Sequence, residues 1–75
     1  MTLDEVALGE KVRILHVNGQ GVLRRRLLDM GLIPKTVVCV RRVAPMGDPI
    51  EFSLRGYVLT LRKEDASTIE VEACI

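Results

Sequence analysis

The chain has 75 residues, which is enough for one small domain and excludes a second. Hydrophobic residues make up 48% of it and charged residues 28%, so the chain can bury a core and does not belong to the disordered class. Its formal net charge is only +1, but ten of the eleven Lys and Arg residues lie within residues 11–62, whereas both ends are acidic. This pattern is typical either of a surface for a charged partner or of a solvated surface on which opposite charges interleave after folding.

The sequence shows no membrane-spanning or secretory segment. Its longest stretch without a charged residue covers residues 14–23, far short of the roughly 20 apolar residues of a membrane helix. The N-terminus lacks the positive region and long apolar run of a secretory signal. We therefore expect a cytoplasmic protein. The two cysteines, Cys39 and Cys74, are too few for a disulfide-stabilised scaffold and match no CxxC spacing, so we expect both to be reduced.

The first predicted elements in chain order are a capped turn, a strand and a helix. Thr2 is a typical N-cap residue for a short turn that contains Asp4 and Glu5. Residues 11–17 are rich in branched apolar side chains and predict the first strand. The apolar spacing of residues 22–30 predicts the main helix. Its core-facing stripe consists of Leu23, Leu27 and Met30.

Gly31 and Pro34 mark the end of this helix. Glycine accepts the left-handed conformation that closes a helix, and Leu32 just beyond it can fold back on the last turn. Pro34 prevents the helix from continuing. The sequence therefore predicts that the helix ends at Gly31.

Four further strands are predicted, over residues 36–43, 50–54, 57–62 and 69–74. Apolar and polar residues alternate in the second and fourth of these strands, which places Phe52 in the core. Arg55 and Gly56 form a tight link, and residues 63–68 fit a single helical turn. A closed sheet satisfies its own strand edges. We therefore predict a mainly β fold, a small SH3-like barrel of about five strands with one inserted α-helix.

Four motifs in this order carry a resemblance to a known family: LRRRLLDMGLIP, VAPMGDPI, LRK and IEV, at residues 23–34, 43–50, 61–63 and 69–71. Together they resemble the FeoA family of ferrous iron transport accessory proteins, and the resemblance covers residues 1–75 as one FeoA-like domain. It implies a cytoplasmic accessory or regulatory protein of ferrous iron uptake. Its implied partner is FeoB, a membrane iron permease with a cytosolic GTP-binding domain, and any membrane association is expected only through that partner.

Lys35 departs from the family pattern, which usually has glycine after the proline. If the turn at Pro34 is of type II, Lys35 has to adopt a positive φ, whereas a type I turn would avoid this.

Catalysis is not expected of this chain. It lacks the GxxxxGK[ST] loop that cradles nucleotide phosphates. Ser53 and Ser67 have no nucleophile-elbow context, and His16 is the only histidine and hence the only histidine base. We therefore expect no enzyme activity and no required cofactor.

Two alternative functions are weaker. A metal-binding module, with weak affinity for Fe(II) or another divalent metal, could use His16, Cys39 and Cys74, since histidine and thiolate are transition-metal ligands, but their spacing supports no site. A nucleic-acid-binding barrel would need several stacking aromatic rings, and only Phe52 and Tyr57 are available. No nucleic-acid partner is therefore expected.

Five residues are the candidates for partner binding. Leu28 lies off the core stripe between Arg24 and Arg25 on the helical wheel, so it is either an apolar anchor surrounded by steering charge or part of a wider core face. The proline-rich loop at residues 44–49 adds Met46, an adaptable apolar side chain, and Asp48; the plain alternative for this loop is a rigid turn. The sequence leaves the oligomeric state open.

Overall fold

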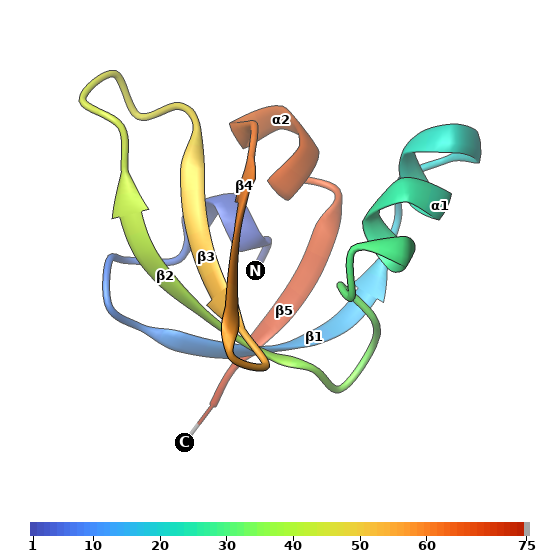
Figure 1. The fold of residues 1–75 in the computed structure, drawn as a ribbon. Coiled ribbons are helices and arrows are strands. Elements are labelled where there is room, and N and C mark those ends of the chain that lie inside the picture. The colour runs from blue at the N-terminus through green and yellow to red at the C-terminus, as the bar shows by residue number, and fades with distance from the viewer. Residues whose placement is uncertain (75) are drawn as a thin grey trace.

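The structure is a computed structural model that describes residues 1–74 (Figure 1). Its elements in chain order are η1 (Leu3–Glu5), β1 (Lys11–Val17), α1 (Gly21–Asp29), β2 (Val37–Val43), β3 (Ile50–Leu54), β4 (Tyr57–Leu61), α2 (Lys63–Ala66) and β5 (Ile69–Ala73). The predicted strands and the main helix are therefore all present, with ends that agree to within one residue. Within residues 1–74, no helix is long and apolar enough to cross a membrane.

The five strands form one antiparallel sheet in the order β4-β3-β2-β1-β5. The sheet is strongly bent, so that β5 and β4 face each other across the core, as in an SH3-like barrel (Figure 1). The predicted closure of the barrel is wrong in one respect, because β4 and β5 do not pair with each other within residues 1–74. The helix α2 connects these two strands instead and contributes the fully buried Ala66 to the core.

The N-terminal segment covers the free edge of β5. The carbonyl of Met1 accepts a hydrogen bond from the Val71 N–H at 2.8 Å, and Thr2 forms a bridge with Glu70. Thr2 also starts η1, as predicted, and the Glu5 carboxylate reaches back to accept the Thr2 backbone N–H at 2.8 Å. This edge of the sheet is therefore protected by the chain itself.

A single hydrophobic core lies inside the bent sheet. Phe52 is fully buried there, as predicted, between its strand neighbours Val40 and Leu59. The other side chains with no accessible surface at all are Leu3, Val12, Leu27, Leu32, Val38, Ala66 and Ile69.

The end of α1 confirms the predicted glycine stop. Gly31 has a φ of 98°, and its N–H bonds to the Leu28 carbonyl at 3.0 Å. The Leu32 N–H bonds to the Leu27 carbonyl at 3.1 Å, and both side chains are fully buried. These two bonds and the accompanying apolar contact constitute a Schellman motif. The chain thus turns back onto the sheet at Leu32.

Two further residues adopt a positive φ without being glycine. Lys35 has a φ of 76°, and the Thr36 N–H bonds to the Ile33 carbonyl at 3.2 Å, so the turn has the positive φ that a type II turn requires. Arg55 has a φ of 49° and is followed by Gly56 at 86°, the combination found in two-residue type I′ hairpins. Arg55 and Gly56 are thus the tight link that the sequence predicted between β3 and β4.

Candidate partner-binding surfaces

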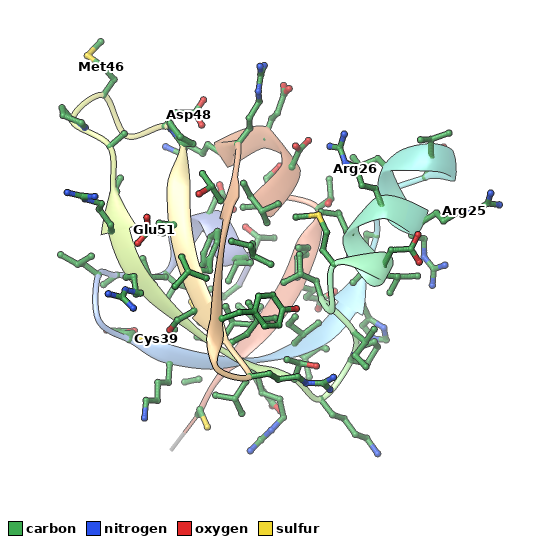
Figure 2. The ribbon with its side chains drawn as sticks, in the orientation of Figure 1. Arg25, Arg26, Cys39, Met46, Asp48 and Glu51 are labelled. Atoms are coloured by element: carbon green, nitrogen blue, oxygen red, sulfur yellow. The ribbon has the colours of Figure 1, made fainter. Side chains whose placement is uncertain are left out.

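The residues predicted to bind a partner fall on two separate surfaces. The helix surface consists of Arg24, Arg25 and Leu28 on α1, and the loop surface consists of Met46 and Asp48 between β2 and β3. Figure 2 shows Arg25 and Met46 at opposite ends of the molecule. The structure therefore does not combine the five residues into one site.

On the helix surface, the three side chains differ in how freely they can contact a partner. Arg25 is exposed and points away from the molecule (Figure 2), and it forms no ion pair within residues 1–74. Arg24 is also exposed, but its Nε donates a hydrogen bond to the Val17 carbonyl at 3.1 Å, which holds it against the end of β1. Arg25 is thus the freer charge of the two.

Leu28 is in contact with the core and also accessible at the surface. It is partly buried and packs against the core, yet it also lines a shallow hollow of about 240 Å³ together with Arg24, Arg25 and Asp29. The hollow thus has one apolar side chain, Leu28, beside two arginines and the carboxylate of Asp29.

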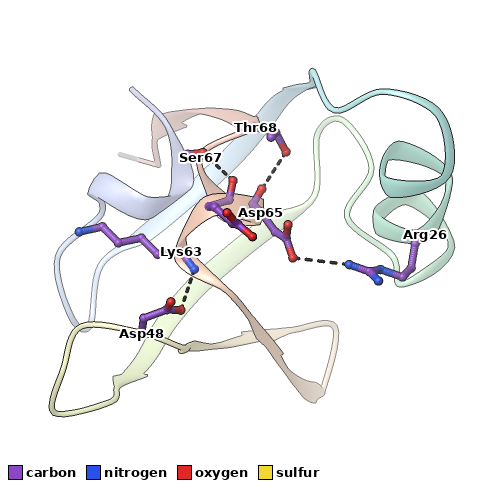
Figure 3. Close-up of polar contacts among 7 residues, drawn as sticks. Arg26, Asp48, Lys63, Asp65, Ser67 and Thr68 are labelled. Carbon is purple, nitrogen blue, oxygen red and sulfur yellow. Dashed lines mark hydrogen bonds and ion pairs between the residues drawn. The ribbon is translucent and has the colours of Figure 1, made fainter.

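Arg26 links α1 to α2. Its guanidinium lies 3.5 Å from the carboxylate of Asp65, which is largely buried (Figure 3). The carbonyls at the end of α2 are satisfied by the hydroxyls of Ser67 and Thr68, which bond to Glu64 and Asp65 at 2.6 and 2.7 Å. The short helix α2 is therefore stabilised by hydroxyl groups at its C-terminal end and by the ion pair with Arg26.

On the loop surface, Met46 and Asp48 have different roles. Met46 is 90% exposed at the tip of the loop (Figure 2). Asp48 points back toward the molecule, and its carboxylate accepts a hydrogen bond of 2.9 Å from the Lys63 backbone N–H at the start of α2 (Figure 3). Asp48 thus caps α2 from a distance of 15 residues in the sequence, a structural role that the sequence did not indicate.

A groove beside this loop was also missed by the sequence reasoning. It has a volume of about 490 Å³ and is lined by Arg42, Val43, Pro45, Pro49 and Thr60, among others. The two prolines were recognised as turn residues, and Val43 is 40% exposed where the register shift between Val40 and Arg42 sets it opposite Ile50. The groove combines residues of β2, β4 and the loop, so no local sequence pattern indicates it.

The three predicted metal ligands do not converge. Cys39 pairs with Lys11 on one half of β1, whereas His16 pairs with Glu70 five residues further along that strand, about 17 Å away at the rise of a strand. Cys74 lies next to Lys11 on the side of β1 opposite Cys39. Within residues 1–74, no group of three or more His, Cys, Asp or Glu side chains is arranged to hold a metal ion.

The bent five-stranded sheet, its inserted helix and its two exposed surfaces define a small SH3-like module. The sequence pattern of the FeoA domain matches residues 1–73. The chain therefore belongs to the FeoA family, as its motifs predicted.

Known proteins agree with this assignment. The chain is 40% identical over 72 residues to the Fe(2+) transport protein A/Fe(2+) transporter FeoB fusion protein of Porphyromonas gingivalis, where the match covers 96% of this chain and 8% of that protein. It is 40% identical to the solution structure of a FeoA-like protein from Clostridium acetobutylicum, with a TM-score of 0.92 over 100% of this chain and 87% of the other. FeoA of Stenotrophomonas maltophilia, solved with zinc and described as an SH3 domain protein, has a TM-score of 0.85 at 24% identity, covers 96% and 89% of the two chains, and shows the fold alone.

Proposed function

We propose that this chain is a cytoplasmic, non-catalytic accessory module of ferrous iron uptake that acts by contact with a FeoB-type membrane permease and its GTP-binding domain. The observation that carries the proposal is the fusion protein, in which a module 40% identical to this chain shares one polypeptide with FeoB. A covalent link keeps two modules at high effective concentration, which benefits modules that work together. The chain corresponds to only 8% of that relative, so transport and GTP hydrolysis are assigned to the partner.

The chemistry of the chain supports an accessory role. It carries no phosphate-binding loop, and its single histidine is an exposed residue of β1. Ser67 donates a hydrogen bond to the Glu64 carbonyl, and Ser53 lies in β3 between Cys39 and Val58 of the neighbouring strands. Association with the membrane is accordingly assigned to the permease.

The helix surface is the docking face in this proposal. Arg25 is exposed and unpaired within the described residues, so it can attract an acidic region of the partner, and Leu28 offers apolar area beside it. Charges at the rim of an interface act mainly on the association rate and on its salt dependence, whereas a central apolar residue acts on the dissociation rate. Substitution of Arg25 should therefore change mainly the association rate, and substitution of Leu28 mainly the dissociation rate.

A quantitative pull-down tests the proposal, with this chain as bait and membranes that contain the FeoB-type permease of the same organism. We expect wild type to retain the permease, Arg25→Glu to retain less at about 50 mM salt, and the difference to shrink at about 500 mM salt because of screening. Lys11→Glu is the matched control, since it makes the same charge change at an exposed position on β1. Failure of wild type to retain the permease contradicts the proposed function.

Leu28→Ser tests the apolar contact. Because Leu28 is partly buried against the core, we expect a loss of about 1–2 kcal/mol in stability, below the range for a fully buried leucine, together with faster dissociation of the permease. Met46→Ser makes the same kind of change on the loop surface at an almost fully exposed side chain. If only Met46→Ser releases the permease, the docking face is the loop surface and not the helix surface.

A further inference from the structure

The two edge strands of the sheet, β5 and β4, differ in how well their free edges are protected. The edge of β5 is covered by Met1 and Thr2 of the same chain, and β5 carries two acidic residues, Glu70 and Glu72. The edge of β4 has neither protection. Its backbone forms no hydrogen bond outside the β3–β4 ladder within residues 1–74, and its sequence YVLTL contains no charge and no proline. Unprotected edges with such sequences are templates for a further strand.

The hairpin turn establishes which backbone groups of β4 face outward. Arg55 and Gly56 form a two-residue turn of type I′, so the flanking residues Leu54 and Tyr57 are a hydrogen-bonded pair. Hydrogen-bonded and non-hydrogen-bonded pairs alternate along an antiparallel ladder. Val58 and Thr60 are therefore in non-hydrogen-bonded pairs with β3, and their N–H and C=O groups point away from it.

The side chains beside this edge indicate what could bind there. Val58 is 45% exposed, and it shares the outer face of the sheet with Val37, which is 40% exposed. An exposed arginine lies at each end of the strand: Arg62 after it, and Arg55 before it, whose Nη2 also donates a hydrogen bond to the Thr36 hydroxyl at 3.2 Å. An extended segment with an uncharged middle and an acidic residue at each end would complement this edge in both backbone and charge.

A second copy of the same chain fits poorly. Antiparallel pairing of β4 with itself, centred on Leu59, would bring the turn residue Arg55 of each copy toward Arg62 and Lys63 of the other copy. Like charges brought close together repel each other. The uncharged strand between two cationic ends therefore disfavours self-pairing and favours an acidic partner.

We infer that the β4 edge is a strand-addition site for an extended, acid-flanked segment of the permease partner. This inference rests on the proposed function. It specifies a second contact with the permease, in addition to the one at the helix surface. The segment would pair with the outward backbone groups of Val58 and Thr60, and its acidic ends would lie near Arg55 and Arg62.

Proline substitution tests the edge at a single backbone group. Thr60→Pro removes an N–H that points away from β3, so the β3–β4 ladder keeps all its bonds, and proline is tolerated at such edge positions. Thr60→Ala is the matched control because it changes the same side chain and retains the N–H. In the permease pull-down we expect about tenfold weaker capture by Thr60→Pro and unchanged capture by Thr60→Ala.

A variant that keeps the backbone intact guards against misfolding of Thr60→Pro. Arg62→Glu reverses the charge at one end of the edge, and we expect it to weaken capture at low salt while the melting temperature stays close to that of wild type. Direct evidence comes from a synthetic peptide of alternating valine and threonine with an aspartate at each end. It should shift the NMR amide signals of Val58 and Thr60 more than a lysine-ended peptide does.

The outcomes separate the two proposals. If wild type captures the permease and folded Thr60→Pro captures it equally well, the edge inference is overturned while the proposed function stands. If wild type captures no permease, the proposed function fails, and the edge inference fails with it as a statement about that partner. A wild-type dimer that Thr60→Pro converts to a monomer would identify a second copy as the occupant and overturn the assignment to the permease.

Discussion

The carboxylate of Asp48 accepts a hydrogen bond from the backbone N–H of Lys63, at 2.9 Å, and so joins the loop between β2 and β3 to the first turn of α2. The first N–H groups of a helix have no partner within the helix itself. The side chain of Arg62, the N-cap residue of α2, does not accept a hydrogen bond from these groups. A residue from a different part of the chain therefore completes the start of α2.

Asp48→Ala is expected to lower the free energy of unfolding by about 0.5–1 kcal/mol, because the Lys63 N–H loses its acceptor in a solvent-accessible position. Chemical denaturation measures the change. Asp48→Asn keeps an oxygen acceptor and should retain most of the stability. Equal stability of the alanine variant and wild type would show that water replaces the carboxylate without cost.

The contact between Gly31 and Tyr57 can be measured with a double-mutant cycle. The Tyr57 hydroxyl donates a hydrogen bond to the Met30 carbonyl, and a methyl group added at Gly31 would occupy the position of that hydroxyl. Gly31→Ala should therefore cost more than the roughly 1 kcal/mol expected for its positive φ alone. In a Tyr57→Phe background the hydroxyl is absent, so the cost of Gly31→Ala should fall toward that value.

Gly56→Ala is the reference for this cycle, because Gly56 has a similar φ of 86° and nothing lies near the added methyl group. Gly31→Ala and Gly56→Ala should therefore differ by the contact with Tyr57. If the two variants unfold at the same denaturant concentration, the hydroxyl moves aside freely and the contact contributes nothing.

Lys35→Gly is expected to stabilise the protein by up to about 1 kcal/mol. Lys35 has a φ of 76°, where a side chain with a Cβ is strained and glycine is not. The gain is partly offset by the greater freedom of glycine in the unfolded chain. Lys35→Ala removes the charge and keeps the Cβ, so it should show no such gain; a gain of equal size would attribute the effect to the lysine charge.

The pH dependence of folding stability at acidic pH should reveal the contribution of Glu5. Hydrogen bonds from the backbone N–H of Thr2, and secondarily from its hydroxyl, lower the pKa of Glu5 below its usual value of 4.5. A carboxyl whose pKa is lowered on folding contributes stability above its unfolded-state pKa and loses it as the pH falls through the folded-state pKa.

Thermal melts of wild type and Glu5→Gln should therefore differ most at about pH 6 to 7, with wild type more stable. The difference should decline below about pH 4.5 and vanish at lower pH, where Glu5 is protonated in both the folded and unfolded states. A difference that stays constant down to about pH 3 would assign the contribution to the shape of the side chain rather than to its charge.

Local patterns predicted most of the fold because the features that define it are local. The alternation around Phe52 specified β3 to the residue, and the glycine at position 31 specified the end of α1. The open side of the barrel was not predictable in this way. It depends on contacts of Met1 and Thr2 with β5, which is distant in the sequence. The spacing of apolar residues does not predict such a contact.

The candidate site was predicted less well for the same reason. Exposure of Arg25 and Met46 follows from their positions on a helix face and at a loop tip, and the structure has both in exposed positions. The capping role of Asp48 and the bond between Arg24 and Val17 depend on tertiary neighbours. Sequence reasoning therefore identified polar groups at the surface but could not tell which of them the protein itself engages.

The cover that Met1 and Thr2 place over β5 also limits the stoichiometry of any assembly through the sheet. A sheet that can be extended at both edges can recruit strand after strand and grow into a fibre. In the part of the chain that the structure describes, only the β4 edge is available, so a module can join another sheet at one edge and not at both. Copies of this module therefore cannot add edge to edge into an open-ended sheet, because pairing through β4 uses the one free edge of each copy.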